Sequence, residues 1–173
     1  MIRSKVGPDS QGIFITLHAQ GEFDRECIDN GTLQLLRTEV PHQVCIDALW
    51  TKAVTYFSEP RHVATQHVIQ QLRMFYESPE STLWVTADTR SLFWCFAEPN
   101  VSVLEDGSRV RKSLGGWSNK DMLGCPLLLD RVDQHRLQIR NHVSAISRIG
   151  DVGYLIDLIN GNTASSSIYH KDK

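Results

Sequence analysis

The sequence predicts a mixed α+β fold, in which a small twisted, mostly antiparallel β-sheet or barrel carries flanking helices. Three observations predict it. Apolar residues recur at helical spacing between residues 42 and 76. The period then changes to two between residues 82 and 114, with turn residues between the apolar runs. A final amphipathic segment, residues 152–159, predicts a closing helix.

The N-terminal part predicts one strand followed by two helices. Residues 12–19 alternate in the manner of a strand, and residues 20–40 fit either a strand or a short helix on either side of the Asn30-Gly31 turn. The first helix is expected over residues 42–57. The apolar stripes are Ile46, Leu49, Trp50, Ala53 and Phe57 on this helix, and Thr65, Val68, Ile69, Leu72, Phe75 and Tyr76 on the second.

The central part predicts two hairpins, each with a short polar turn between its arms. Gly115, Gly116 and Trp117 follow as a flexible corner, and Ser118-x-x-Asp121 resembles a capping box for one helical turn. The hairpin arms are residues 82–87 and 92–97 in the first, and residues 101–104 and 109–114 in the second. The remaining expected elements are strands at 136–140 and 143–149 and the helix at 152–159, with Asp151 as N-cap and Gly161 as stop.

The length of 173 residues fits a single domain, expected over residues 1–161. Residues 162–173 read as a flexible tail or the start of a linker to a missing effector domain. The sequence contains neither an apolar run of membrane-spanning length nor a secretory signal at its start, so we expect a cytoplasmic protein without a membrane partner.

The sequence contains none of the common enzyme motifs. Phosphate-binding loops, nucleophile elbows and zinc-binding patterns are absent from it, and its four cysteines are widely separated. We therefore expect no catalytic residue, no metal and no cofactor, and a binding domain rather than an enzyme. A metal-dependent nuclease or hydrolase, whose acids and histidines converge only in three dimensions, remains an alternative.

Charge is distributed unevenly along the chain. Residues 1–106 carry a net charge of −6, whereas residues 107–149 carry eight Lys or Arg against three Asp, a net of +5. An acidic part beside a basic part favours a polyanionic partner on one side, although an uneven solvated surface gives the same count. Arg109 and Arg111 share one face of their predicted strand, which is suited to gripping a phosphate.

The first hairpin carries two tryptophans whose orientation depends on the turn. A two-residue or four-residue turn places Val85 and Trp94 on one wholly apolar face, which must be core. Trp84 then shares the other face with Phe93 and small polar groups, a composition that suits either the wall of a pocket for a flat ligand or core under the helices. Trp117, after its two glycines, either covers an edge of the core or lines a ligand site.

Three stretches of the sequence resemble a known family. TLWVTADTRSLFWCFAEPNV, SRVRKSLGGWSNKDMLG and the terminal LIDLING look like the PUA-like group that includes the EVE and YTH-type readers, especially those fused to modification-dependent restriction nucleases. The resemblance is strongest over residues 72–161, whereas two helices precede it where a strand-first start is expected. It implies a small twisted barrel and a pocket of two or three aromatic rings that accepts a flipped, modified base.

The resulting hypothesis is a domain that recognises a modified, methylated base in DNA by base flipping, as the specificity module of a restriction or defence protein with a fused or associated nuclease. An RNA reader of the same fold, a hydrolase and a protein-interaction domain remain alternatives. The base-binding candidates are Trp84, Trp94, Trp117, Phe93, Asp88, Ser118, Asn119 and Asp121. The phosphate-binding candidates are Arg109, Arg111, Lys112, Arg136 and Arg140.

Overall fold

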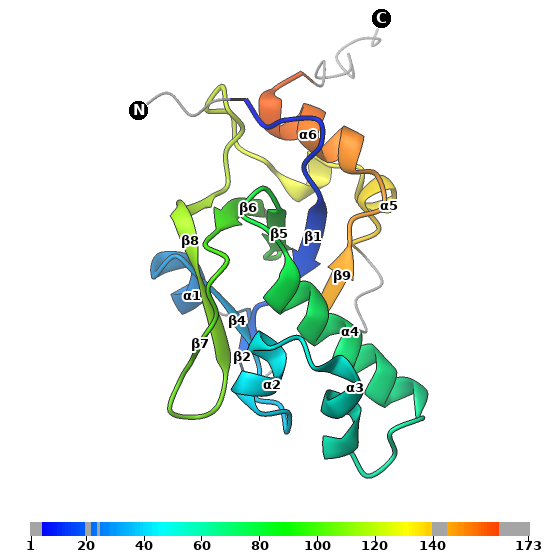
Figure 1. Ribbon diagram of the computed structural model, residues 1–173. Helices are drawn as coiled ribbons and strands as arrows, with labels where there is room; N and C mark the ends of the chain where they lie inside the picture. The colour runs from blue at the N-terminus through cyan, green and yellow to red at the C-terminus, as the bar shows by residue number, and fades with distance from the viewer. Residues whose placement is uncertain (1–4, 20–21, 24, 140–144, 163–173) are drawn as a thin grey trace, which may run out of the picture.

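The computed structural model describes residues 5–19, 22–23, 25–139 and 145–162 (Figure 1). It confirms the mixed α+β class: a curled, mostly antiparallel sheet of seven strands forms a half-barrel and is covered by helices. The strand order is β4-β8-β6-β5-β1-β9, and β7 also pairs with β8. The parallel neighbours in this sheet are β1 and β5.

The strands of this sheet are β1 (Gly12–Ile15), β4 (Thr32–Leu35), β5 (Leu83–Ala87), β6 (Leu92–Ala97), β7 (Ser102–Val103), β8 (Arg109–Ser118) and β9 (Ile146–Arg148). A separate pair consists of β2 (His18–Ala19) and β3 (Glu22–Phe23). The α-helices are α1 (Arg25–Asp29), α2 (His42–Ile46), α3 (Trp50–Ala53), α4 (Val63–Glu77), α5 (Gln134–Leu137) and α6 (Val152–Asn160), and the 3-10 helices are η1 (Val54–Tyr56) and η2 (Leu129–Arg131).

The first predicted hairpin is confirmed as β5 and β6, joined by four residues. Val85 pairs with Trp94, and Trp84 pairs with Cys95, so the two tryptophans point to opposite faces of the sheet. The turn is closed by the Asp88 carboxylate, whose Oδ1 accepts two backbone N–H groups. The even loop length therefore gives the face assignment that the sequence predicts.

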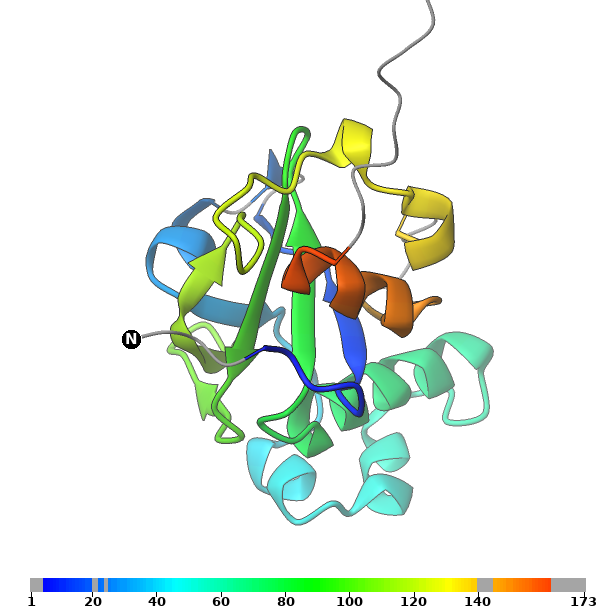
Figure 2. The same cartoon turned by 90° about the horizontal axis from the view of Figure 1, so that it is seen from above.

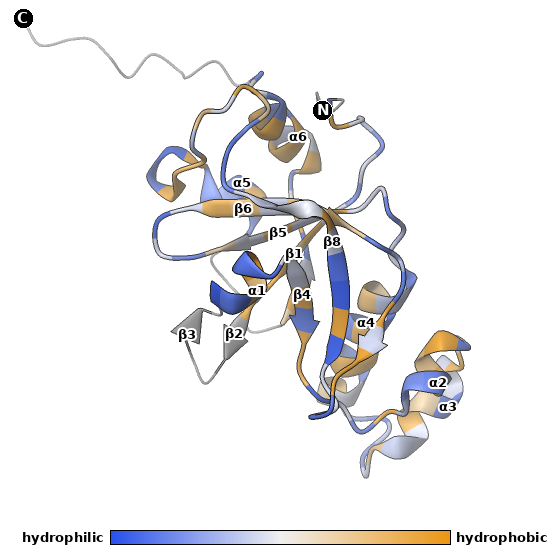
Figure 3. Cartoon of the chain, turned by 90° about the vertical axis from the view of Figure 1, so that its left-hand side faces the viewer, coloured by the Kyte–Doolittle hydropathy of each residue, from blue (hydrophilic) through white to orange (hydrophobic). Residues whose placement is uncertain are grey.

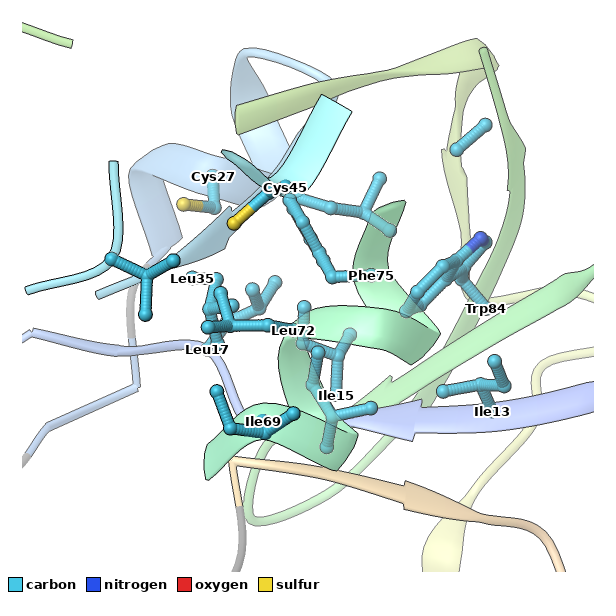
Figure 4. Packing of buried hydrophobic residues seen from close by; sticks show 14 of the residues in the cluster. Ile13, Ile15, Leu17, Cys27, Leu35, Cys45, Ile69, Leu72, Phe75 and Trp84 are labelled. Carbon is cyan, nitrogen blue, oxygen red and sulfur yellow. The ribbon is translucent and has the colours of Figure 1, made fainter. Parts of the chain in front are cut away.

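Each face of the sheet carries its own hydrophobic core, and Figure 3 shows α4 on one side of β5 and β6 and α6 on the other. The first core lies under α4, where Phe75 packs edge-on against Trp84 with ring centroids 5.9 Å apart (Figure 4). The second core lies under α6 and contains Trp94 with Leu155 and Ile159. Both faces of the central strands are thus buried, which explains why β5 and β6 read as nearly continuous apolar runs.

Strand β8 contains the segment that the sequence predicts as a flexible corner. Its N-terminal part pairs with β4 and β7, and its C-terminal part pairs with β6. Between the pairs Phe96–Leu114 and Trp94–Ser118, β8 carries two extra residues. Gly115 and Gly116, with φ of 82° and 79°, form this bulge, so Trp117 lies within a strand rather than in a loop.

The helix predicted over residues 42–57 is wrong as a single element. The chain forms α2, then α3 and η1, and the break lies at Ala48, which adopts a left-handed φ of 52°. Because the chain turns there, Ile46 and Leu49 of the predicted stripe are 53% and 43% exposed, whereas Val44 and Cys45 are buried. The second predicted helix is confirmed as α4, whose buried residues include Ile69, Leu72 and Phe75.

The C-terminal part agrees with the sequence in its last helix. Asp151 caps α6 by accepting the Tyr154 N–H, and Gly161 ends it at φ 72°. The strand predicted at 136–140 is wrong over its described residues, 136–139. Residues 136 and 137 belong to α5, which Asp133 caps, and residues 138 and 139 form a turn in which Gln138 has a left-handed φ of 58°. In place of the helical turn predicted after Ser118 there is a hydrogen-bonded turn, closed by the side chain of Asp121. The predicted tail lies outside the described residues from residue 163 onward.

Candidate functional site

Trp117 lies beside an open cavity of about 450 Å³ at one end of the β4–β8 pair. Its indole N–H donates to the Thr32 carbonyl oxygen at 2.9 Å, which fixes the ring across the two strands. The ring is half-buried and packs against the first core. Of the three tryptophans predicted to hold a base, Trp117 is the one that lines a cavity among the described residues.

The cavity combines an aromatic wall with a polar rim. Lys112 is exposed on the rim, and Asn30 stands at the end of α1. Ser113, also in the lining, fixes the backbone of Gly31, because its N–H and its hydroxyl both donate to the Gly31 carbonyl, at 2.8 and 2.7 Å. A side chain could not replace the hydrogen at Gly31: φ is +64°, and a Cβ would lie 2.8 Å from the Ser113 hydroxyl oxygen. A flat ligand can therefore approach the Trp117 indole beside the fixed backbone at Gly31 and the ammonium group of Lys112.

The predicted aromatic cage is not formed by the other two tryptophans. Trp84 is 0% and Trp94 2% exposed, and they belong to the cores on opposite faces of the sheet. Trp94 donates its indole N–H to the Lys120 carbonyl at 2.8 Å. Phe93 is also buried, beneath the Arg25 guanidinium. Trp84 and Trp94 lie in these two cores, and Phe93 is buried as well, because helices or the 119–132 segment cover both faces of the hairpin.

The predicted phosphate grip on β8 is likewise buried. Arg111 is completely buried, and it donates to the carbonyls of Phe75, Ser78 and Glu98 at 3.0, 3.0 and 2.7 Å. It thereby satisfies carbonyl groups at the C-terminal end of α4, where a cation is favoured. Burial lowers the pKa of Arg111 to about 10, so the side chain remains a cation at neutral pH. Arg109 is 4% exposed and donates to the Val40 carbonyl at 2.7 Å.

The other predicted basic residues do not complete a grip. Arg136 forms two hydrogen bonds with the Asp151 carboxylate, at 3.0 and 2.6 Å, and stacks over Tyr154. The hydrogen bond to this carboxylate raises the pKa of Arg136. Arg140 lies outside the described residues. Among the described residues, the exposed Lys112 is thus the basic side chain in the lining of the Trp117 cavity, and Arg109, Arg111 and Arg136 are engaged elsewhere.

The four polar candidates lie outside the described lining of the Trp117 cavity, and the side chains of Asp88, Ser118 and Asp121 bond to nearby backbone groups. Asp88 closes the β5–β6 turn, and Asp121 accepts the N–H groups of Leu123 and Cys125. The hydroxyl of Ser118 donates to a backbone carbonyl two residues later, and the Asn119 carbonyl accepts the Leu127 N–H. The described lining of the cavity includes none of these four residues. Its polar groups come instead from Lys112 and Ser113 of β8 and from the α1–β4 connection, which contributes the Asp29 carboxylate and Asn30. The Asn30-Gly31 turn was the sequence signal for this connection.

A second polar cluster lies between α2 and α4. His42 Nδ1 lies 2.8 Å from the Tyr76 hydroxyl, and Cys45 and Arg109 are close by. Burial lowers the pKa of His42 and raises those of Cys45 and Tyr76, and the Arg109 cation lowers all three. Burial thus favours the neutral thiol of Cys45, although the nearby Arg109 cation acts in the opposite direction.

The described residues form neither a metal-binding cluster nor a membrane-spanning helix. They contain no cluster of three or more His, Cys, Asp or Glu side chains arranged to bind a metal ion. None of the helices they form has the length and apolar character required to span a membrane. No family model matches the chain, and comparison with curated proteins and with solved structures gives no match either.

Proposed function

We propose that this chain is a nucleic-acid-binding domain that takes one unpaired base against the indole of Trp117. The observation that carries the proposal is the open cavity beside this ring, with Lys112 on its rim. An aromatic face stacks on a base, and an ammonium group attracts the neighbouring phosphate. The cavity volume of about 450 Å³ lies within the range of small-ligand sites, about 300–1,000 Å³.

The number of accessible rings decides which form of nucleic acid fits. Stacking on one aromatic ring contributes about 1–3 kcal/mol per base, whereas extruding a base from a duplex costs a few kcal/mol. A cage of three rings could offset that cost fully, whereas one ring at best balances it. The proposed ligand is therefore a single strand or an already unpaired base. The resemblance described above makes a methylated base the first modification to compare.

A fluorescently labelled single-stranded oligonucleotide, in DNA and RNA form and with and without methylated bases, provides the test. Trp117→Leu keeps an apolar side chain against the core and removes the stacking face. We expect it to weaken binding by about tenfold, the equivalent of a lost stacking contact. Lys112→Gln is expected to weaken binding to all sequences. It should also reduce the slope of log binding constant against log salt concentration by about one in magnitude. Fluorescence anisotropy at several salt concentrations measures both effects.

Lys120→Gln is the matched control, because Lys120 is an exposed lysine outside the described lining of the cavity. It should leave the affinity nearly unchanged. Equal losses in Lys112→Gln and Lys120→Gln would indicate attraction to the general charge instead of this site. Absence of binding to every oligonucleotide would contradict the proposal and favour a protein-interaction domain, and metal-dependent cleavage of the probe would favour the nuclease alternative.

A further inference from the structure

A second cavity lies at the other end of the sheet, between α4 and the strands β1 and β9. It has a volume of about 600 Å³ and adjoins a smaller one of about 270 Å³. The two cavities share Gln70, Met74 and Arg148, so they form one groove along α4. Because β9 ends the sheet order opposite β4, this α4–β9 groove is separate from the cavity of Trp117.

The α4–β9 groove has an apolar base and a rim rich in side-chain amides. Ile13 and Ile69, both buried, belong to its lining together with Met74. The rim carries four glutamines, which can each donate and accept hydrogen bonds. Phosphate and sulfate groups offer acceptors only, whereas a polypeptide backbone offers N–H and C=O groups in alternation. The four glutamines are Gln11, Gln66, Gln70 and Gln71.

The charge of the groove is positive once its internal pairs are counted. Glu77 is the acidic residue of the described lining, and it is already engaged by Arg73 at 3.5 Å and by the Trp50 indole N–H at 2.6 Å. Arg148 is exposed and forms no ion pair with any described residue. A ligand that carries a carboxylate would therefore complement the groove at Arg148.

The backbone of β9 directs part of its N–H and C=O groups away from the sheet. The Thr16 N–H donates to the Ala145 carbonyl and the Ile149 N–H donates to the Gly12 carbonyl, at 2.8 and 3.0 Å. In this antiparallel register, the N–H and C=O groups of the alternate residues Ile146 and Arg148 point away from β1. No described strand pairs with that outer edge of β9. Within the part of the chain that the structure describes, this unpaired edge of β9 and the groove thus lie side by side.

We propose that the α4–β9 groove binds an extended peptide segment of a partner protein, with an acidic side chain of the peptide paired to Arg148. The peptide adds to the outer edge of β9 through its backbone, and the glutamines of α4 bind its remaining amide groups. This site is independent of the proposed nucleic-acid site, and it involves neither Trp117 nor Lys112.

A phage-displayed library of random short peptides, selected on the full chain, is the probe. We expect the enriched peptides to share an Asp or Glu at a fixed position. Binding of a synthetic representative should weaken at least about tenfold in Arg148→Asp, because a favourable charge pair becomes a repulsive one. Exchanging the acidic residue of the peptide for Arg should restore binding to that variant. Binding of this representative should also shift the NMR methyl signals of Met74 and Ile146.

Arg131→Asp is the matched control, since Arg131 is an exposed arginine in η2, outside the described lining of the groove. It should bind the selected peptide as the unmodified chain does. Any of three results would overturn the proposal. The first is that no peptide is enriched, and the second is an equal loss of binding in Arg148→Asp and Arg131→Asp. The third is that the peptide with Arg in place of its acidic residue does not restore binding to Arg148→Asp.

Discussion

At the scale of single residues, the buried arginines show how a chemical type can mislead when its surroundings are unknown. Arg109 and Arg111 do share one face of a strand, as the sequence predicts, but that face is turned into the protein. Arg111 donates hydrogen bonds to three backbone carbonyls, and its guanidinium carbon lies 5.2 Å from the centre of the Trp84 ring. Its planar fork joins β8 to the end of α4, which makes it a structural residue.

Replacing this fork with an ammonium group should therefore destabilise the fold. Arg111→Lys keeps the charge but replaces three separate donor nitrogens with one, so we expect two of the three charge-assisted hydrogen bonds to be lost. We expect the free energy of unfolding to fall by about 3 kcal/mol, since such bonds contribute about 1.5–3 kcal/mol each. Urea denaturation measures it, and Arg131→Lys on the surface is expected to change the stability by less than about 0.5 kcal/mol. An equally small change in Arg111→Lys would show that the fork does not hold these elements together.

At the scale of elements, the sequence predicted those helices and strands that depend mainly on residues within their own segments. The β5–β6 hairpin, α4 and α6 follow from periodicity, turn residues and caps within their own segments. The break between α2 and α3 was not predicted, because its left-handed residue is an alanine, Ala48, rather than a glycine. The chain on either side of Ala48 is held by Val44, Cys45 and Ala53, which pack in the first core with residues far along the chain. Likewise, Trp117 was a candidate from its two glycines, whereas its partner Thr32 is 85 residues away and is brought to it only by the pairing of β4 with β8.

The glycine bulge of β8 allows a prediction about an element. Gly116 has a φ of 79°, and a Cβ placed there would meet no atom within 4 Å. The cost of Gly116→Ala is therefore conformational rather than steric, and we expect the free energy of unfolding to fall by about 1–2 kcal/mol. The midpoint of urea unfolding measures this change. An unchanged midpoint would mean that the backbone at Gly116 is free to adopt an ordinary conformation.

At the scale of the whole molecule, one curled sheet separates two hydrophobic cores and places a cavity near each of its ends. Figure 2 shows the central strands between the helices from above. Because both sheet faces are covered, the two candidate binding sites lie at the margins of the sheet. They are the Trp117 cavity beside β4 and β8, and the α4–β9 groove. The sequence could indicate aromatic and basic residues, but only the fold decides which of them remain at these margins.

The most direct measurement of the central claim is the NMR signal of the Trp117 indole N–H during titration with a short single-stranded oligonucleotide. Trp117→Phe assigns the signal by removing it. The account predicts that this signal shifts progressively with ligand, while those of the buried Trp84 and Trp94 change far less. A Trp117 signal that stays in place while the oligonucleotide binds, or an absence of any change throughout the titration, would contradict the account.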